Sequence, residues 1–175
     1  MDFSWVRELA EEANQIEVAR QEQERVRLEE QRAVAAATVP FVEKLYMLLN
    51  TCTEEFNKHM HYPSLRATMS RFQKKTRGAP YGTNDPNFVS EEIAYFTFTR
   101  RSWMFGVRGI NGVVDFVEFP VTEGAAALSM KLDELGIEGQ YVLNAHLDQE
   151  NRQVVWTMNE GLLDGPKLIQ LCQDF

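Results

Sequence analysis

The pattern of apolar and polar residues along the first 38 positions predicts one long helix that is mostly polar. Residues 3–37 contain no glycine or proline and are rich in Glu, Gln, Arg and Ala, which favour helix. A helix of that length overhangs a body made from the remaining residues, so we expect residues 1–38 to project from it or to self-associate. The weak heptad register favours a loose antiparallel pair or a two-chain bundle over a strict zipper. Apolar residues recur at helical spacing only in the first third, at Phe3, Val6, Leu9, Ala13 and Ile16.

Pro40 predicts a kink or the start of a new helix, because a proline inside a helix removes a hydrogen bond and clashes one turn back. The strongest helical pattern of the sequence follows it, so we expect a helix over residues 41–60 that lies on a sheet. Its apolar residues recur at one face: Phe41, Leu45, Leu48, Leu49, Cys52 and Phe56.

The dipeptide Asn111-Gly112 predicts a β-hairpin, because it stands between two apolar runs and both central residues of a type I′ turn need positive φ. A two-residue turn sets the register of the two strands, and it places Arg108 opposite Asp115, a favourable cross-strand pair. The other expected pairs are Ile110 with Val113, Val107 with Phe116, and Phe105 with Glu118.

A second hairpin is predicted between residues 141 and 158, with a four-residue loop at 148–151. This loop leaves one face apolar and the other polar, as a half-buried antiparallel sheet requires. Its expected pairs are Ala145 with Val154, Leu143 with Trp156, and Tyr141 with Met158.

Other segments give weaker patterns. Residues 65–70 alternate apolar and polar, which favours a strand, although a helix also fits. Residues 74–88 contain two prolines and two glycines and predict a long loop. Residues 122–136 fit a short helix and a strand equally well. The last 13 residues predict a helix with Pro166 in its first turn.

These elements predict an α+β fold, since runs of strands follow runs of helices. We expect an antiparallel β-meander of five or six strands, packed on one face by helices, with a long N-terminal helix. Residues 39–175 would form the globular domain.

Residues 94–109 interleave aromatic residues with arginines, which is typical either of a base-stacking sheet or of the two faces of an ordinary hairpin. The hairpin register places Trp103, Phe105 and Val107 beside aliphatic partners and Arg108 on the opposite face. We therefore expect these rings to be core residues under a helix.

The charge distribution is uneven. The net charge of −8 argues against broad affinity for nucleic acid, yet residues 57–84 contain six basic residues and no acidic one. This excess predicts either neutralisation by acidic parts of the same chain or binding of an external polyanion such as nucleic acid. The candidate anion-binding residues are Arg66, Arg71, Lys74, Lys75 and Arg77, with Arg100 and Arg101 as additions.

The sequence offers little support for catalysis. We find no Gly-x-Ser-x-Gly elbow, no phosphate-binding glycine loop and no His-Glu-x-x-His motif, so we assign no catalytic residue, no metal ligand and no cofactor. An enzyme site near His59, His61 and His146 is retained as a second alternative.

The remaining features concern location. Cys52 and Cys172 fall at apolar helical positions and are expected to be core residues in a reducing compartment. We expect no signal peptide and no membrane span, because the sequence shows no basic leader and no window of 18 apolar residues. We therefore expect a cytoplasmic location.

The sequence as a whole predicts a non-enzymatic interaction protein. It would dock another protein, or a second copy of itself, through Phe3, Val6, Leu9 and Ile16. Nucleic-acid binding through residues 58–77 is the alternative.

Overall fold

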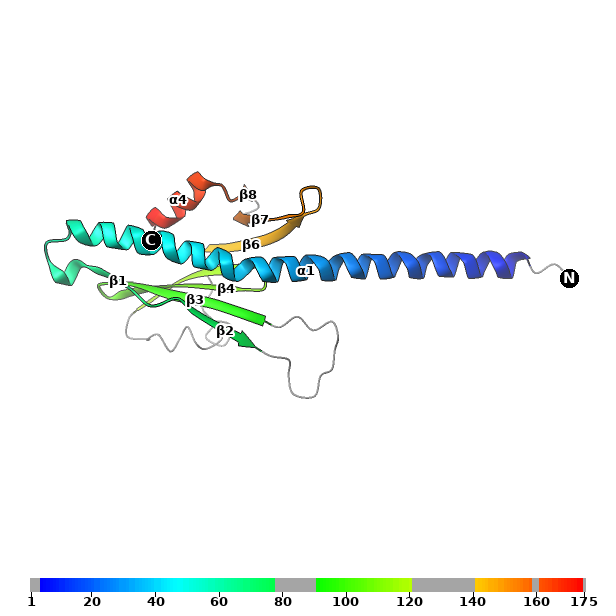
Figure 1. The fold of residues 1–175 in the computed structure, drawn as a ribbon, viewed down its shortest axis with the longest axis horizontal. Coiled ribbons are helices and arrows are strands. Elements are labelled where there is room, and N and C mark those ends of the chain that lie inside the picture. The colour runs from blue at the N-terminus through cyan, green and yellow to red at the C-terminus, as the bar shows by residue number, and fades with distance from the viewer. Residues whose placement is uncertain (1–3, 78–90, 121–140, 159–160, 175) are drawn as a thin grey trace.

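The fold consists of a long helix packed along an antiparallel sheet (Figure 1), as a computed structural model describes it for residues 4–77, 91–120, 141–158 and 161–174. The sheet joins all eight strands in the order β1-β3-β4-β5-β6-β7-β8, and β2 pairs with β3 beside β1. The predicted α+β class is confirmed, and the eight strands of the described residues exceed the five or six expected because β2 and β8 were not predicted as strands. The elements are α1 (Ser4–His59), a 3-10 turn (Pro63–Leu65), β1 (Ala67–Met69), β2 (Gln73–Arg77), β3 (Glu91–Arg100), β4 (Trp103–Ile110), β5 (Val113–Pro120), β6 (Tyr141–Asp148), β7 (Gln153–Met158), β8 (Gly161–Leu162) and α4 (Gly165–Asp174).

Helix α1 runs without interruption for 56 residues, so the predicted new start at Pro40 is wrong. A proline inside a helix costs about 3 kcal/mol or more. Val39 and Val42, on either side of it, are buried against the sheet, and burying each side chain contributes about 1.5–3 kcal/mol. The helix therefore continues because packing on both sides of Pro40 offsets the lost hydrogen bond.

The core lies between α1 and one face of the sheet, as predicted for the helix after Pro40. Phe41 stacks on Trp156 of β7 with ring centroids 4.0 Å apart, and Leu168 of α4 packs at the edge of the same cluster. A smaller cluster of Tyr95, Met104 and Val117 is buried apart from it. The buried residues of the main cluster are Val39, Val42, Leu45, Leu49, Ala94, Phe96, Val107, Val114, Phe116, Leu143 and Trp156.

The first hairpin has the predicted register. Strands β4 and β5 pair Ile110 with Val113 next to the turn and Phe105 with Glu118 farther along. Asn111 and Gly112 both have positive φ, 45° and 86°, as a type I′ turn requires. The Arg108 Nη2 atom lies 2.7 Å from Asp115 Oδ2, and both side chains are largely buried. The charge pairing that the sequence indicated is therefore present.

The turn of this hairpin fixes the position of α1. The fully buried hydroxyl of Thr38 accepts a hydrogen bond from the Gly112 amide at 2.7 Å and donates one to the Val34 carbonyl at 2.9 Å. The Gly112 carbonyl accepts the Ala145 amide at 2.7 Å. One glycine thus connects the helix, the first hairpin and β6 through buried hydrogen bonds.

The second hairpin is present, but its predicted register is wrong by two residues. Ala145 pairs with Trp156 and Leu143 with Met158, because the loop comprises residues 149–152. The Asp148 carboxylate accepts hydrogen bonds from the backbone amides of residues 150 and 151, and Arg152 has a φ of 52°. The loop therefore begins and ends one residue later than predicted. A shift of two residues leaves each side chain on its predicted face.

Several local predictions need correction. Residues 67–69 form a strand, as favoured, but residues 74–77 of the predicted loop form most of β2, because their backbone pairs with β3. The rings of Phe96 and Phe116 are buried, whereas Trp103 is 47% exposed at the end of β4 and is not a core residue. Cys52 is also exposed. The predictions for residues 78–88 and 122–136 lie outside the described residues, as does the side chain of Cys172.

Candidate functional site

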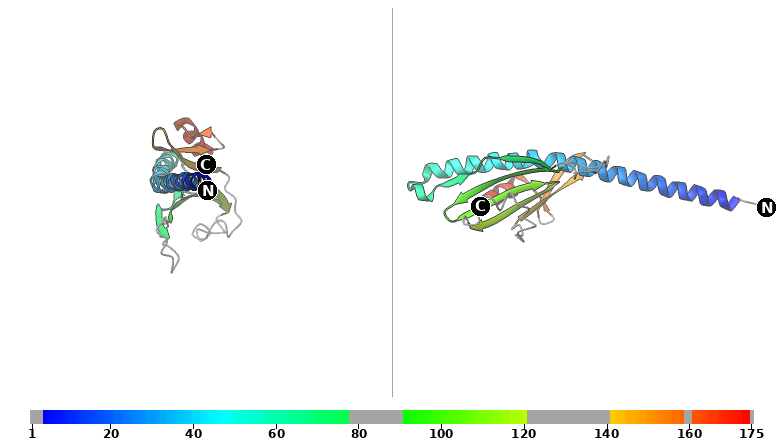
Figure 2. Two further views of the ribbon diagram at one scale, coloured as in Figure 1. Left: turned by 90° about the vertical axis from the view of Figure 1, so that its right-hand side faces the viewer. Right: turned by 90° about the horizontal axis from the view of Figure 1, so that it is seen from below.

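The N-terminal part of α1 projects beyond the sheet (Figures 1 and 2). Every side chain from residue 4 to residue 25 is exposed, and Val26 is the first that is half-buried. Further along the helix, Val34 and Thr38 are buried against the body. At 1.5 Å per residue, the exposed part is about 33 Å long. The packed part of α1 therefore begins inside the segment 1–38.

This projecting part displays an apolar stripe. Val6, Leu9 and Ile16, three of the predicted partner-binding residues, are 45%, 59% and 63% exposed, and Phe3 lies outside the described residues. Trp5 is 60% exposed and was missed by the sequence analysis. It stands four residues before Leu9, on the same helix face, and that spacing would have identified it. We define the docking stripe as Trp5, Val6, Leu9 and Ile16.

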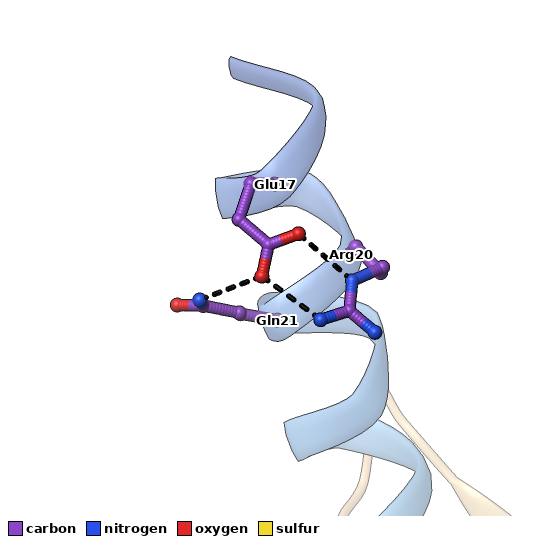
Figure 3. A network of polar contacts seen from close by, with 3 residues as sticks. All are labelled: Glu17, Arg20 and Gln21. Carbon is purple, nitrogen blue, oxygen red and sulfur yellow. Dashed lines mark hydrogen bonds and ion pairs between the residues drawn. The ribbon is translucent and has the colours of Figure 1, made fainter. Parts of the chain in front are cut away.

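Ion pairs within the helix stabilise its next part. Glu17 accepts hydrogen bonds from Arg20 and Gln21, each at 2.9 Å (Figure 3). Two further pairs with the same three-residue spacing, Glu22 with Arg25 and Glu24 with Arg27, follow it. Pairs at this spacing favour helix in a segment that has no tertiary contacts. They explain how a helix without an apolar face against the body continues to the stripe.

The Glu17 carboxylate is expected to titrate at unusually low pH. Its hydrogen bonds with Arg20 and then Gln21 lower its pKa from 4.5 to about 2. The contribution to helix stability is therefore fully present above about pH 4.5 and lost as the pH falls through about 2. A carboxyl carbon NMR titration should give a midpoint for Glu17 near 2, and Arg20→Gln should move it toward 4.5. Arg25→Gln is the control, because it removes the same charge from a residue that pairs with Glu22 and not with Glu17. It should leave the Glu17 midpoint unchanged. If both variants shift this midpoint equally, the Arg20 hydrogen bonds are not the cause of the low pKa.

Several cations of the basic segment, residues 58–77, contact other side chains of the same chain. Lys58 pairs with Glu55 at 2.8 Å, Lys74 pairs with Glu92 at 2.9 Å, and the Lys75 ammonium lies 5.4 Å from the centre of the Tyr95 ring. The register of β2 also places Arg77 opposite Glu91.

The remaining cations are dispersed. Successive residues of a strand point to opposite faces, so Lys74 is separated from Lys75 and Arg77. Arg66 follows the 3-10 turn and Arg71 lies between β1 and β2; neither forms an ion pair with the described residues. Within the described residues, ion pairs therefore neutralise Lys58 and Lys74, and binding of an external polyanion stays a prediction.

The three histidines lie on different elements. His59 ends α1, with its Nε2 atom 3.4 Å from Glu55, and His61 follows in the connection to the 3-10 turn. His146 lies on β6 with its Nε2 atom 3.2 Å from the Thr157 hydroxyl. Residues 4–77, 91–120, 141–158 and 161–174 contain no group of three or more His, Cys, Asp or Glu side chains arranged to hold a metal ion.

Comparison of the chain with models of protein families, with curated proteins and with solved structures found no match. In the part of the chain that the structure describes, neither helix combines the length and the apolarity that crossing a bilayer requires. The docking stripe on α1 is therefore the feature on which a functional proposal can be based.

Proposed function

We propose that this protein is a non-enzymatic interaction protein whose projecting helix docks a second copy of the chain, or another protein, through the docking stripe. The observation that supports the proposal is the exposure of the four apolar side chains of the docking stripe, on the part of α1 that projects beyond the sheet. Apolar side chains at helical spacing are the usual anchors of helix docking, and covering them removes apolar surface from water.

Self-association through the stripe would cover Trp5, Leu9 and Ile16 of both copies, which are exposed in the single chain. Removing this apolar surface from water favours the assembly. The population of the assembly should depend on protein concentration.

A cytoplasmic location belongs to the same proposal. The Cys52 thiol is free and exposed, and such a thiol is retained most readily in a reducing compartment. No cofactor is assigned to the protein.

The proposal is tested by removing the projecting part of α1 while keeping the packed part. Residues 26–175 retain Val34 and Thr38, which are buried against the hairpin. Light scattering over a range of concentrations should show association of the intact chain and a monomer for residues 26–175. Urea unfolding of the two proteins should give the same stability in the monomeric range, because residues 4–25 are exposed along their whole length. If both proteins are monomers, self-association is wrong and only docking of another protein remains.

A further inference from the structure

An apolar cavity lies at the other end of α1, away from the docking stripe. Its volume is about 420 Å³, within the range of small-molecule pockets. It opens between the C-terminal half of α1, strands β3 and β4, and helix α4 (Figure 1 shows these elements). Six of its apolar lining residues are Leu48, Leu49, Phe56, Phe98, Phe105 and Ile169.

The lining offers few polar groups to a ligand. The Thr53 hydroxyl donates its hydrogen to the Leu49 carbonyl at 2.7 Å, so this donor is already used. Cys52 contributes a thiol, which is a weak hydrogen-bonding group. The one charged side chain of the lining is Arg100, at the end of β3. A ligand that matches this surface is apolar over most of its length.

Arg100 is placed to receive a negative charge. Its guanidinium carbon lies 4.9 Å from the centre of the Phe56 ring, so the cation is held against one wall of the cavity. Within the described ranges Arg100 forms no ion pair, in contrast to Lys58 and Lys74. A guanidinium that stacks on a ring keeps its edge free for two parallel hydrogen bonds to a carboxylate.

We propose that this cavity binds a single-chain fatty carboxylate, with the alkyl chain among the apolar side chains and the carboxylate on Arg100. Burial of the chain supplies most of the affinity. The single cation at the rim matches a head group with one negative charge and orients the ligand. The site is separate from the docking stripe and does not depend on it.

The test uses the full chain at neutral pH and compares dodecanoate with dodecanol by calorimetry, below the concentration at which either ligand aggregates. A charge-assisted hydrogen bond contributes a factor of roughly 10 to 100 in affinity, so dodecanoate should bind at least about tenfold more tightly. Arg100→Gln should remove this difference. Arg101→Gln, which removes the same charge from the adjacent residue outside the cavity lining, should preserve it.

A second variant tests the cavity without changing its charge. Cys52 is exposed on α1 and lines the cavity, so Cys52→Phe is expected to narrow the apolar space and weaken binding of both ligands while the protein remains folded. If dodecanoate does not bind in a saturable way, or binds no better than dodecanol, the proposal is wrong. If Cys52→Phe binds both ligands as tightly as the unchanged protein, they bind outside the cavity, and this result would also overturn the proposal. If dodecanoate fails to bind and Cys52→Phe abolishes self-association, the occupant is a second copy of the chain.

Discussion

Replacing Gly112 by alanine is expected to lower the free energy of unfolding by about 2–5 kcal/mol. A Cβ atom at Gly112 would lie 1.9 Å from Cγ1 of Val34, which is buried on α1. Overpacking of this kind costs about 1–3 kcal/mol. The φ of 86° adds about 1–2 kcal/mol for a residue with a side chain. The helix must move away from the turn, and this movement stretches the 2.7 Å hydrogen bond between Thr38 and the Gly112 amide.

Urea unfolding measures this loss, and the chain supplies a matched control. A Cβ atom at Gly165 would have no atom within 4 Å, so Gly165→Ala should leave the midpoint of unfolding nearly unchanged. The clash can also be separated from the backbone strain. Val34→Ala removes the methyl groups that the new Cβ atom meets, so the double variant should be more stable than the two single losses predict by addition. Equal losses for the two glycine variants would refute the close contact between turn and helix.

The predictable parts of this fold are those decided by neighbouring residues. Asn111 and Gly112 specify a turn by their tolerance of positive φ, and the turn then fixes the whole register of β4 and β5. The second hairpin has no such dipeptide. Its loop closes through Arg152 with positive φ, which the residue type does not indicate, and the predicted register was therefore wrong.

Tertiary contacts decided the elements that the sequence did not reveal. Helix α1 continues through Pro40 because valines on both sides are buried by strands far along the chain. Residues 74–77 were included in the predicted loop because of the prolines and glycines that follow them in the sequence. They pair with β3 instead, and Lys74 forms an ion pair with Glu92 there. Trp103 has the pattern of a core residue but is the first residue of its strand and is 47% exposed there.

The two candidate sites differ in how far the sequence indicates them. The stripe is local, so helical spacing identified Leu9 and Ile16, and only Trp5 was missed. The cavity is assembled from α1, β3, β4 and α4, so its lining residues come from positions more than 100 apart in the chain. The sequence indicates Arg100 only as an addition to the candidate anion-binding residues of segment 58–77, and its position over Phe56 depends on a contact between two distant parts of the chain.

Two glutamates in the docking stripe, Leu9→Glu together with Ile16→Glu, are expected to convert the self-associated protein to a monomer. Each replacement removes about 1.5–3 kcal/mol of apolar burial per side chain, and both copies lose it. Each also brings a charge into the contact, where it has no partner of opposite sign within the stripe. The dissociation constant should therefore rise at least about 100-fold, since each 1.4 kcal/mol is a factor of ten.

Val18 provides the matched control for this variant. It is 67% exposed, as apolar as the stripe residues, and two positions after Ile16, which places it on the other side of the helix. Sedimentation at several concentrations should show that Val18→Glu associates like the unchanged protein, whereas the double variant remains monomeric. Unfolding in urea should be the same for all three as monomers, because these side chains do not contact the body. If Val18→Glu disrupts assembly as strongly as the stripe variant, general charge repulsion is responsible, and the stripe does not form the contact.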